Sequence, residues 1–112
     1  MLTSKFAGAG AVLQKYEDLK SSADAKRHPP EFVLNALGYS YLRTGPIDDA
    51  IQLFEKNVSD HPDSSNAYDS LGEAYAAAGK KQMAIENYEK SIKLDSKNQN
   101  AIDRLEKLKG QQ

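Results

Sequence analysis

The chain of 112 residues has no cysteine and no tryptophan, and its apolar stretches are short. Without cysteine it can form neither disulfides nor thiolate metal sites, although this absence does not identify the compartment. A helix needs about 20 consecutive apolar residues to cross a bilayer, so we expect no membrane span. We expect no signal peptide either, because residues 1–13 are rich in glycine and form only a brief apolar segment.

Basic residues are dispersed along the chain. There are 15 Lys and Arg residues against 16 Asp and Glu residues, and the only arginines are Arg27, Arg43 and Arg104. Nucleic-acid binding depends on clustered basic side chains that neutralise phosphates. No basic stripe is present, so we expect no nucleic-acid partner. The balance of charges is most uneven in residues 31–64, which carry six acidic and two basic side chains.

The motifs of common catalytic and cofactor sites are also missing. The sequence has no Gly-x-Ser-x-Gly elbow, no P-loop and no His-Glu-x-x-His. His28 and His61 both precede proline at expected turns, and neither has a second imidazole at ligand spacing. We therefore predict no metal site, no cofactor and no catalytic activity.

The sequence contains an internal repeat with a period of 34 residues. Its first copy holds Leu37, Gly38, Tyr41, Gly45, Ala50 and Ile51, and its second holds Leu71, Gly72, Tyr75, Gly79, Ala84 and Ile85. A fixed period of this length indicates stacked supersecondary units. Glycine in a helix interior costs about 1 kcal/mol relative to alanine. We therefore predict that a second helix approaches closely at Gly38 and Gly72, with aromatic side chains such as Phe54 and Tyr88 filling the space around each crossing.

The two copies resemble the tetratricopeptide repeat. In residues 31–64 the positions of its pattern hold Leu34, Leu37, Gly38, Tyr41, Ala50, Phe54 and Pro62. In residues 65–98 they hold Tyr68, Leu71, Gly72, Tyr75, Ala84 and Tyr88, with Ser96 where the pattern has proline. The resemblance implies an all-α fold, a right-handed solenoid of helical hairpins with two repeats.

The two ends of the chain depart from the repeat. Residues 99–110 begin like a third unit, but Glu106 replaces the packing glycine, so this segment is predicted to be a capping helix. Residues 4–22 are predicted to form an extra amphipathic helix, followed by a linker over residues 23–30. The apolar face of this extra helix holds Val12, Leu13, Tyr16 and Leu19. The whole chain, residues 1–112, is expected to be one domain.

A narrower resemblance covers about residues 12–108. Tyr16 and Leu19, the stretch 34–39 and the stretch 66–75 are similar to the tetratricopeptide tail at the C-terminus of some bacterial esterases and beta-lactamase-like serine hydrolases. This resemblance implies an accessory module rather than catalysis, because the hydrolase part is absent. We favour the cytoplasm, and the periplasm applies if the module belongs to a secreted hydrolase.

The repeat resemblance also implies where a partner binds. In this family the first helix of each pair lines a concave groove, and the residues that touch ligands form a stripe. In this chain the stripe consists of Phe32, Asn35, Tyr39, Leu42, Arg43, Asn66, Asp69 and Glu73, followed by Ala76 and Ala77. The first half is apolar and aromatic and the second is acidic. The expected function is a non-catalytic interaction module whose partner is a protein or peptide with an apolar anchor and a basic residue.

Two alternatives stay open at this point. The apolar face of the N-terminal helix can cover Phe32, Tyr39 and Leu42, which would leave the groove partly occupied by the chain itself. The same helix can dock on a second copy and give a homodimer. The alternative function is accordingly a structural or self-assembling module, or an accessory module derived from a hydrolase tail.

Overall fold

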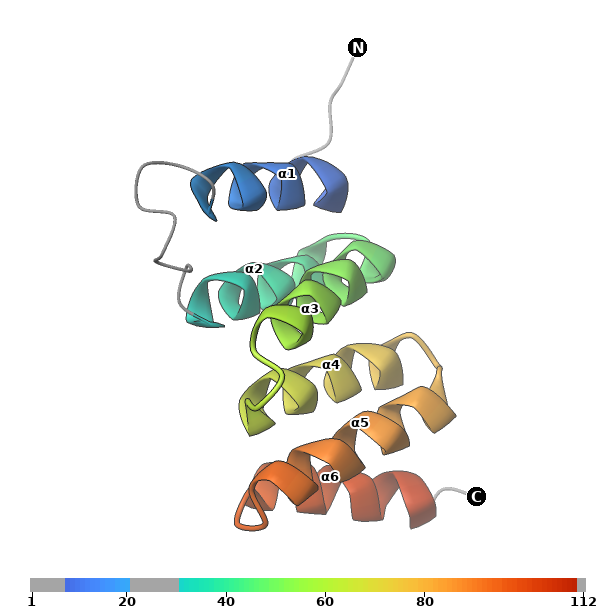
Figure 1. The fold of residues 1–112 in the computed structure, drawn as a ribbon. Helices are drawn as coiled ribbons and strands as arrows, with labels where there is room; N and C mark the ends of the chain where they lie inside the picture. Colours follow the sequence, from blue (N-terminus) through green and yellow to red (C-terminus); the bar gives the residue numbers. More distant parts are fainter. Residues whose placement is uncertain (1–7, 21–30, 111–112) are drawn as a thin grey trace.

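The computed structural model describes residues 8–20 and 31–110, which form six α helices and no strand. In chain order the helices are α1 Ala9–Lys20, α2 Glu31–Thr44, α3 Ile47–Asp60, α4 Ser65–Ala77, α5 Lys81–Leu94 and α6 Gln99–Gly110. Helices α2 and α3 form one hairpin and α4 and α5 form the next (Figure 1). The predicted all-α fold is confirmed.

The hairpins stack in sequence order. Helix α3 packs against α4, and α5 packs against α6, so that each unit contacts the next one along the chain. The result is a thin slab of 45 × 40 × 17 Å (Figure 1). This arrangement is a tetratricopeptide-like helical solenoid, in which α6 occupies the range where the sequence predicts the capping helix.

Glycine and an aromatic ring meet inside each hairpin. A methyl group added at Gly38 would lie 2.5 Å from Cε1 of Phe54, and one added at Gly72 would lie 3.0 Å from Cδ1 of Tyr88. Both rings are fully or almost fully buried. The close helix approach predicted from the two interior glycines is therefore correct, and it explains why these positions hold no side chain.

Local signals set the ends of the helices. Ser64 precedes α4, and its hydroxyl accepts a 3.0 Å hydrogen bond from the Ala67 amide, which satisfies one of the free N–H groups of the first turn. Gly79 follows α4 with φ of 79°, a conformation that favours glycine. The Lys80 amide then donates to the Tyr75 carbonyl at 2.9 Å, closing the end of α4.

The turn after the second repeat forms without the expected proline. The Asn98 side chain accepts a 3.2 Å hydrogen bond from the Ala101 amide and so caps α6. Its amide nitrogen donates to the hydroxyls of Ser65 at 3.2 Å and Ser91 at 3.0 Å. A partly buried polar network thus holds this turn, with Ser96 in the position of the proline.

Helix α1 lies at the N-terminal end of the stack and packs against α3 (Figure 1). The described helix runs from Ala9, and the carbonyl of the preceding Gly8 accepts the Ala11 amide at 3.0 Å. Leu13 packs on the core and Glu17 pairs with Lys56 of α3. Residues 4–7 and 21–22 and the linker 23–30 lie outside the described residues, as do the side chains of Val12, Tyr16 and Leu19.

Candidate functional site

The inner helices α2, α4 and α6 carry the residues that the repeat places on one face. We call the side chains of Phe32, Asn35, Tyr39, Leu42, Arg43, Asn66, Asp69, Glu73, Asn100 and Arg104 the stripe surface. Of the eight residues predicted from the sequence, the structure leaves Phe32, Arg43 and Asn66 exposed, keeps Asn35, Tyr39, Leu42 and Glu73 half-buried, and buries Asp69.

A chain of polar contacts joins the three inner helices. The Tyr39 hydroxyl of α2 donates to Oε1 of Glu73 in α4 at 2.8 Å. The other oxygen of Glu73 lies 3.6 Å from Nη1 of Arg104 in α6. Burial, with a smaller contribution from the Glu73 carboxylate, raises the pKa of Tyr39 well above its usual value, so the phenol stays a donor at neutral pH. Glu73 therefore ties successive repeats together across the stripe surface.

Asp69 is the most buried member of the stripe surface, with 6% of its surface exposed. Its Oδ2 accepts hydrogen bonds from the side-chain amides of Asn98 at 3.3 Å and Asn100 at 3.0 Å. Its Oδ1 is buried and has no hydrogen-bond partner within the described residues. Burying a carboxylate oxygen without a hydrogen bond costs free energy.

The α2 end of the stripe surface is apolar and open. Phe32 is 69% exposed, whereas Leu42 and Tyr39 pack on the core and the Tyr39 ring meets Phe54 edge to face, with centroids 5.1 Å apart. Of the alternatives left open by the sequence, the one in which the N-terminal helix covers Phe32 is not what the structure shows. Helix α1 instead lies against α3, where Leu13 reaches the core and Glu17 finds a cation.

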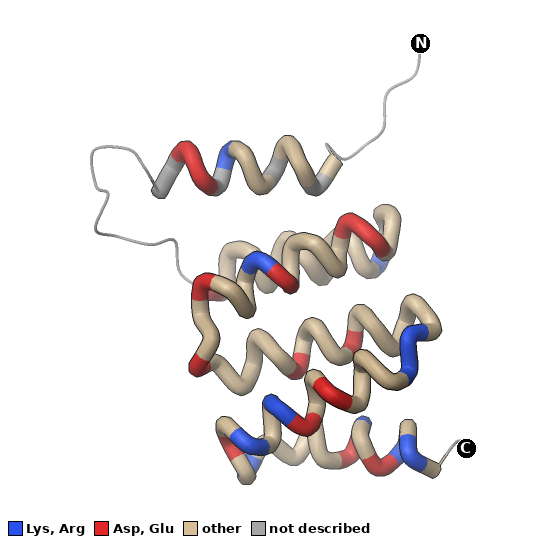
Figure 2. The backbone as a smooth tube through the Cα atoms, turned by 45° about the vertical axis from the view of Figure 1, so that its right-hand side comes forward, with Lys and Arg blue, Asp and Glu red and all other residues tan. Residues whose placement is uncertain are grey.

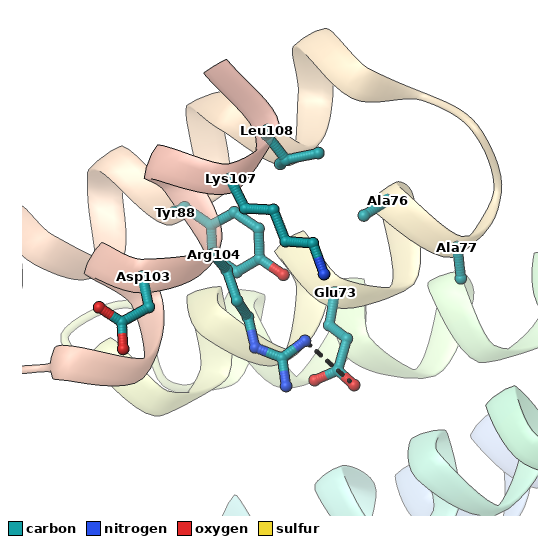
Figure 3. A pocket seen from close by; sticks show the side chains of 8 residues that line it. All are labelled: Glu73, Ala76, Ala77, Tyr88, Asp103, Arg104, Lys107 and Leu108. Carbon is teal, nitrogen blue, oxygen red and sulfur yellow. Dashed lines mark ion pairs between the residues drawn. The ribbon is translucent and has the colours of Figure 1, made fainter. Parts of the chain in front are cut away.

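A hollow of about 600 Å³ lies where α4, α5 and α6 meet (Figure 3). Its lining consists of Glu73, Ala76, Ala77, Tyr88, Asp103, Arg104, Lys107 and Leu108. Figure 3 shows Lys107 and Arg104 extending toward the side where Glu73 lies, while the Asp103 carboxylate is directed away from Lys107. Burial raises the pKa of Tyr88 to about 12, so its hydroxyl is neutral.

The stripe predicted from the sequence does not include α6. Residues 99–110 are predicted to be a capping helix because Glu106 replaces the packing glycine. Moving Asn66, Asp69 and Glu73 forward by one more period of 34 residues gives positions 100, 103 and 107. Position 100 contacts Asp69, and positions 103 and 107 line the hollow. Arg104 falls at the position of Ser70, which the stripe did not include, so the shift alone does not identify it.

Charge is distributed unevenly along the stack. Figure 2 shows acidic positions toward both ends of α3, and lysines gathered on α5, on α6 and at the turn between α4 and α5. Residues 31–64 carry six acidic and two basic side chains, whereas residues 65–110 carry eight basic and seven acidic ones. The first hairpin is therefore the acidic end of the molecule.

The turn between the two repeats offers less as a site. A shallow depression there is lined by Glu31, by residues 60–63 and by Ser64. The His61 amide closes α3 by donating to the Asn57 carbonyl at 2.9 Å, which is the turn role expected for this histidine. No group of three or more His, Asp or Glu side chains in residues 8–20 and 31–110 is arranged to hold a metal ion. His28 lies outside the described residues.

The lengths and the hydropathy of the described helices bear on whether any of them could span a membrane. In that part of the chain, no helix combines the length and the apolar character needed to cross a bilayer.

Comparisons with known proteins agree with this geometry. A model of the tetratricopeptide repeat family matches residues 31–97. A solved structure of a point mutant of MamA is similar, with a TM-score of 0.64 and 27% identity over 91% of this chain and 74% of that one. The comparison with curated proteins gives no match, so the resemblance to hydrolase tails stays a prediction. The chain belongs to the tetratricopeptide repeat family, whose generally non-catalytic fold supports a role as a protein–protein interaction module.

Proposed function

We propose that the stripe surface binds a segment of a partner protein. The observation that carries this proposal is that the inner helices form one connected face through Tyr39, Glu73 and Arg104, with the Phe32 ring open at one end. Aromatic side chains are enriched among the residues that contribute most to binding at interfaces, and the exposed Phe32 ring is available for such a contact. The partner segment places an apolar side chain against Phe32.

The partner also brings an N–H donor to Asp69. A buried carboxylate oxygen without a hydrogen bond costs free energy, and a basic side chain of the partner would remove that cost. Glu73 is less available, because Tyr39 and Arg104 already occupy its two oxygens. The basic residue of the partner is therefore assigned to Asp69 rather than shared between the two acids.

The test compares matched variants as baits in an extract of the source organism. Phe32 and Met83 are both large, exposed and apolar, with 69% and 42% of their surface accessible, but Met83 lies on α5 outside the stripe surface. A partner that is recovered by the unaltered chain and by Met83→Ala, but lost with Phe32→Ala, supports the proposal. Equal recovery with all three baits contradicts it.

A further variant tests the role of the buried acid. Asp69→Asn keeps the size of the side chain and removes its charge, so it should weaken recovery of the same partner while the helical circular dichroism is retained. Asp69→Lys is a poor choice, because it would break the hydrogen bonds from Asn98 and Asn100. Unchanged recovery with Asp69→Asn would remove the basic residue from the proposal but leave the Phe32 anchor.

A second candidate function is self-association. It is favoured by the side of α2 that corresponds to the side of α4 packed against the preceding hairpin. Ala67 and Ser70 are buried where α4 packs against the preceding hairpin. The equivalent positions one repeat earlier, Val33 and Ala36, are half-buried and exposed. We propose that a second copy covers this side. Light scattering should then give the mass of a dimer that Ala36→Asp converts to a monomer, and a monomer at all concentrations would exclude the candidate.

A further inference from the structure

We propose that the hollow between α4, α5 and α6 receives an acidic side chain, Asp or Glu, of the partner segment together with an adjacent aliphatic side chain. This inference rests on the proposed function, since it assigns the chemistry of the partner where the stripe surface meets α6. The partner segment would then carry a basic residue at Asp69 and an acidic residue at the hollow. These two opposite charges would fix how the segment lies along the stripe surface.

The first argument is the balance of uncommitted charge in the hollow. Glu73 already accepts from Tyr39 and pairs with Arg104. Asp103 accepts a 2.7 Å hydrogen bond from Gln99, and its carboxylate is directed away from Lys107 (Figure 3). Lys107 lines the same hollow and forms no ion pair or hydrogen bond with any other residue in the described ranges. Lys107 is therefore the charged side chain of this lining that lacks a partner in the described ranges and can meet the carboxylate of a ligand.

The second argument is the surrounding surface. Ala76 and Ala77 of α4 and Leu108 of α6 give the hollow apolar walls, and the almost fully buried Tyr88 contributes to the lining. Its volume of about 600 Å³ lies within the range of sites that hold small ligands, and it is ample for one aliphatic and one acidic side chain. The apolar walls suit the aliphatic residue, and Lys107 at the edge suits the carboxylate.

Arg104 makes the same face more selective. Its Nε donates to Oδ1 of Asn100 at 3.2 Å and its Nη1 lies 3.6 Å from Glu73, so the guanidinium is held beside the hollow. A basic side chain entering the hollow would be repelled by Lys107, whereas a carboxylate would be attracted to it, because the charge of Arg104 is already balanced by Glu73. Like-charge contact is a common way in which interfaces reject a wrong partner.

The test is a chemical-shift titration of the full chain with capped dipeptides at millimolar concentration. The probes are acetyl-Leu-Glu-amide, acetyl-Leu-Gln-amide and acetyl-Leu-Lys-amide, with acetyl-leucine supplying a free terminal carboxylate. We expect the glutamate probe to shift the amides of Ala76, Ala77 and Leu108 and to bind about threefold more tightly than the glutamine probe. Tighter binding of the lysine probe or of acetyl-leucine, or no shift with any probe, overturns the inference.

Two charge reversals on α6 give the matched control. Lys107→Glu should abolish the preference for the glutamate probe, whereas Lys109→Glu, which alters a cation 3.5 Å from Glu89 of α5, should leave it intact. If the preference survives Lys107→Glu, the inference fails. That failure is separate from failure of the proposed function, because loss of the captured partner with Phe32→Ala does not depend on Lys107.

Discussion

Tyr39 and Glu73 occupy the same position in successive repeats, and the hydroxyl of the first donates a 2.8 Å hydrogen bond to the carboxylate of the second. The contact spans 34 residues of sequence, the length of one repeat. Equivalent side chains on neighbouring inner helices lie next to each other, so residues one period apart in the sequence form a direct contact between repeats.

Removing this hydrogen bond should weaken the stack. Tyr39→Phe keeps the ring against Phe54 and should lower the free energy of unfolding by about 1 kcal/mol. Tyr68→Phe is the control, because the Tyr68 hydroxyl has no hydrogen-bond partner among the described residues and should be dispensable. Urea unfolding followed by circular dichroism measures both. Equal stability of the two variants would show that the Tyr39–Glu73 contact contributes nothing.

The two interior glycines should tolerate alanine unequally. At Gly38 an added methyl group would lie 2.5 Å from the buried ring of Phe54, and overpacking of this kind costs about 1–3 kcal/mol. The corresponding distance at Gly72 is 3.0 Å, so Gly72→Ala should cost less, while Gly72→Leu should be severely destabilising. Gly10→Ala meets no atom within 4 Å and serves as the control. Gly38→Ala as stable as Gly10→Ala would mean that the helix crossing is wrong.

Asn57 should be replaceable with a gain in stability. Its side chain is 0% exposed, and neither of its polar atoms has a hydrogen-bond partner in the described structure. Leucine is close in size and has no polar atoms to bury, so Asn57→Leu should raise the free energy of unfolding by about 1 kcal/mol. The equivalent Ser91 donates to the Ser65 carbonyl at 2.8 Å, and Ser91→Ala should be destabilising instead. A loss of stability in Asn57→Leu would contradict this account.

Alkaline pH should destabilise the fold through its buried tyrosines. Burial raises the pKa of Tyr88 from 10.0 to about 12, and burial also raises the pKa of Tyr75, with a smaller effect of Glu55. Because the unfolded chain loses these protons first, their contribution to stability is complete below pH 10 and is lost as the pH rises through 12. At pH 11 the loss from Tyr88 should be about 1 kcal/mol.

Urea unfolding at several pH values measures this effect. The slope between pH 10 and 12 should be smaller in Tyr88→Phe once its lower starting stability is taken into account. A flat stability profile over this range in the unaltered chain would show that the tyrosines titrate normally in the folded state.

The fold could be predicted from the sequence because its determinants are close together in each repeat. Gly38 and Phe54, and again Gly72 and Tyr88, belong to one hairpin, so a single repeat contains both sides of the contact. The place of α1 could not be predicted in the same way. An amphipathic helix must cover its apolar face, but its sequence does not say whether that face meets α2 or α3.

The sequence did not reveal the surroundings of the candidate site residues. The family resemblance puts Asp69 in the predicted stripe, but its hydrogen bonds come from Asn98 and Asn100, which approach from the C-terminal part of the chain. Arg104 belongs to a segment that departs from the repeat pattern, so its pairing with Glu73 becomes visible only in three dimensions. The repeat period does not predict polar contacts between segments that are distant in the sequence.

The most direct test of the proposed function is hydrogen exchange of the chain, alone and with its captured partner. Binding on the stripe surface should slow exchange in α2, α4 and α6, with protection near Phe32 and Asp69, and leave the amides of α3 and α5 nearly unchanged. Protection confined to α3 and α5 would contradict the account, because it would place the partner on the opposite helices.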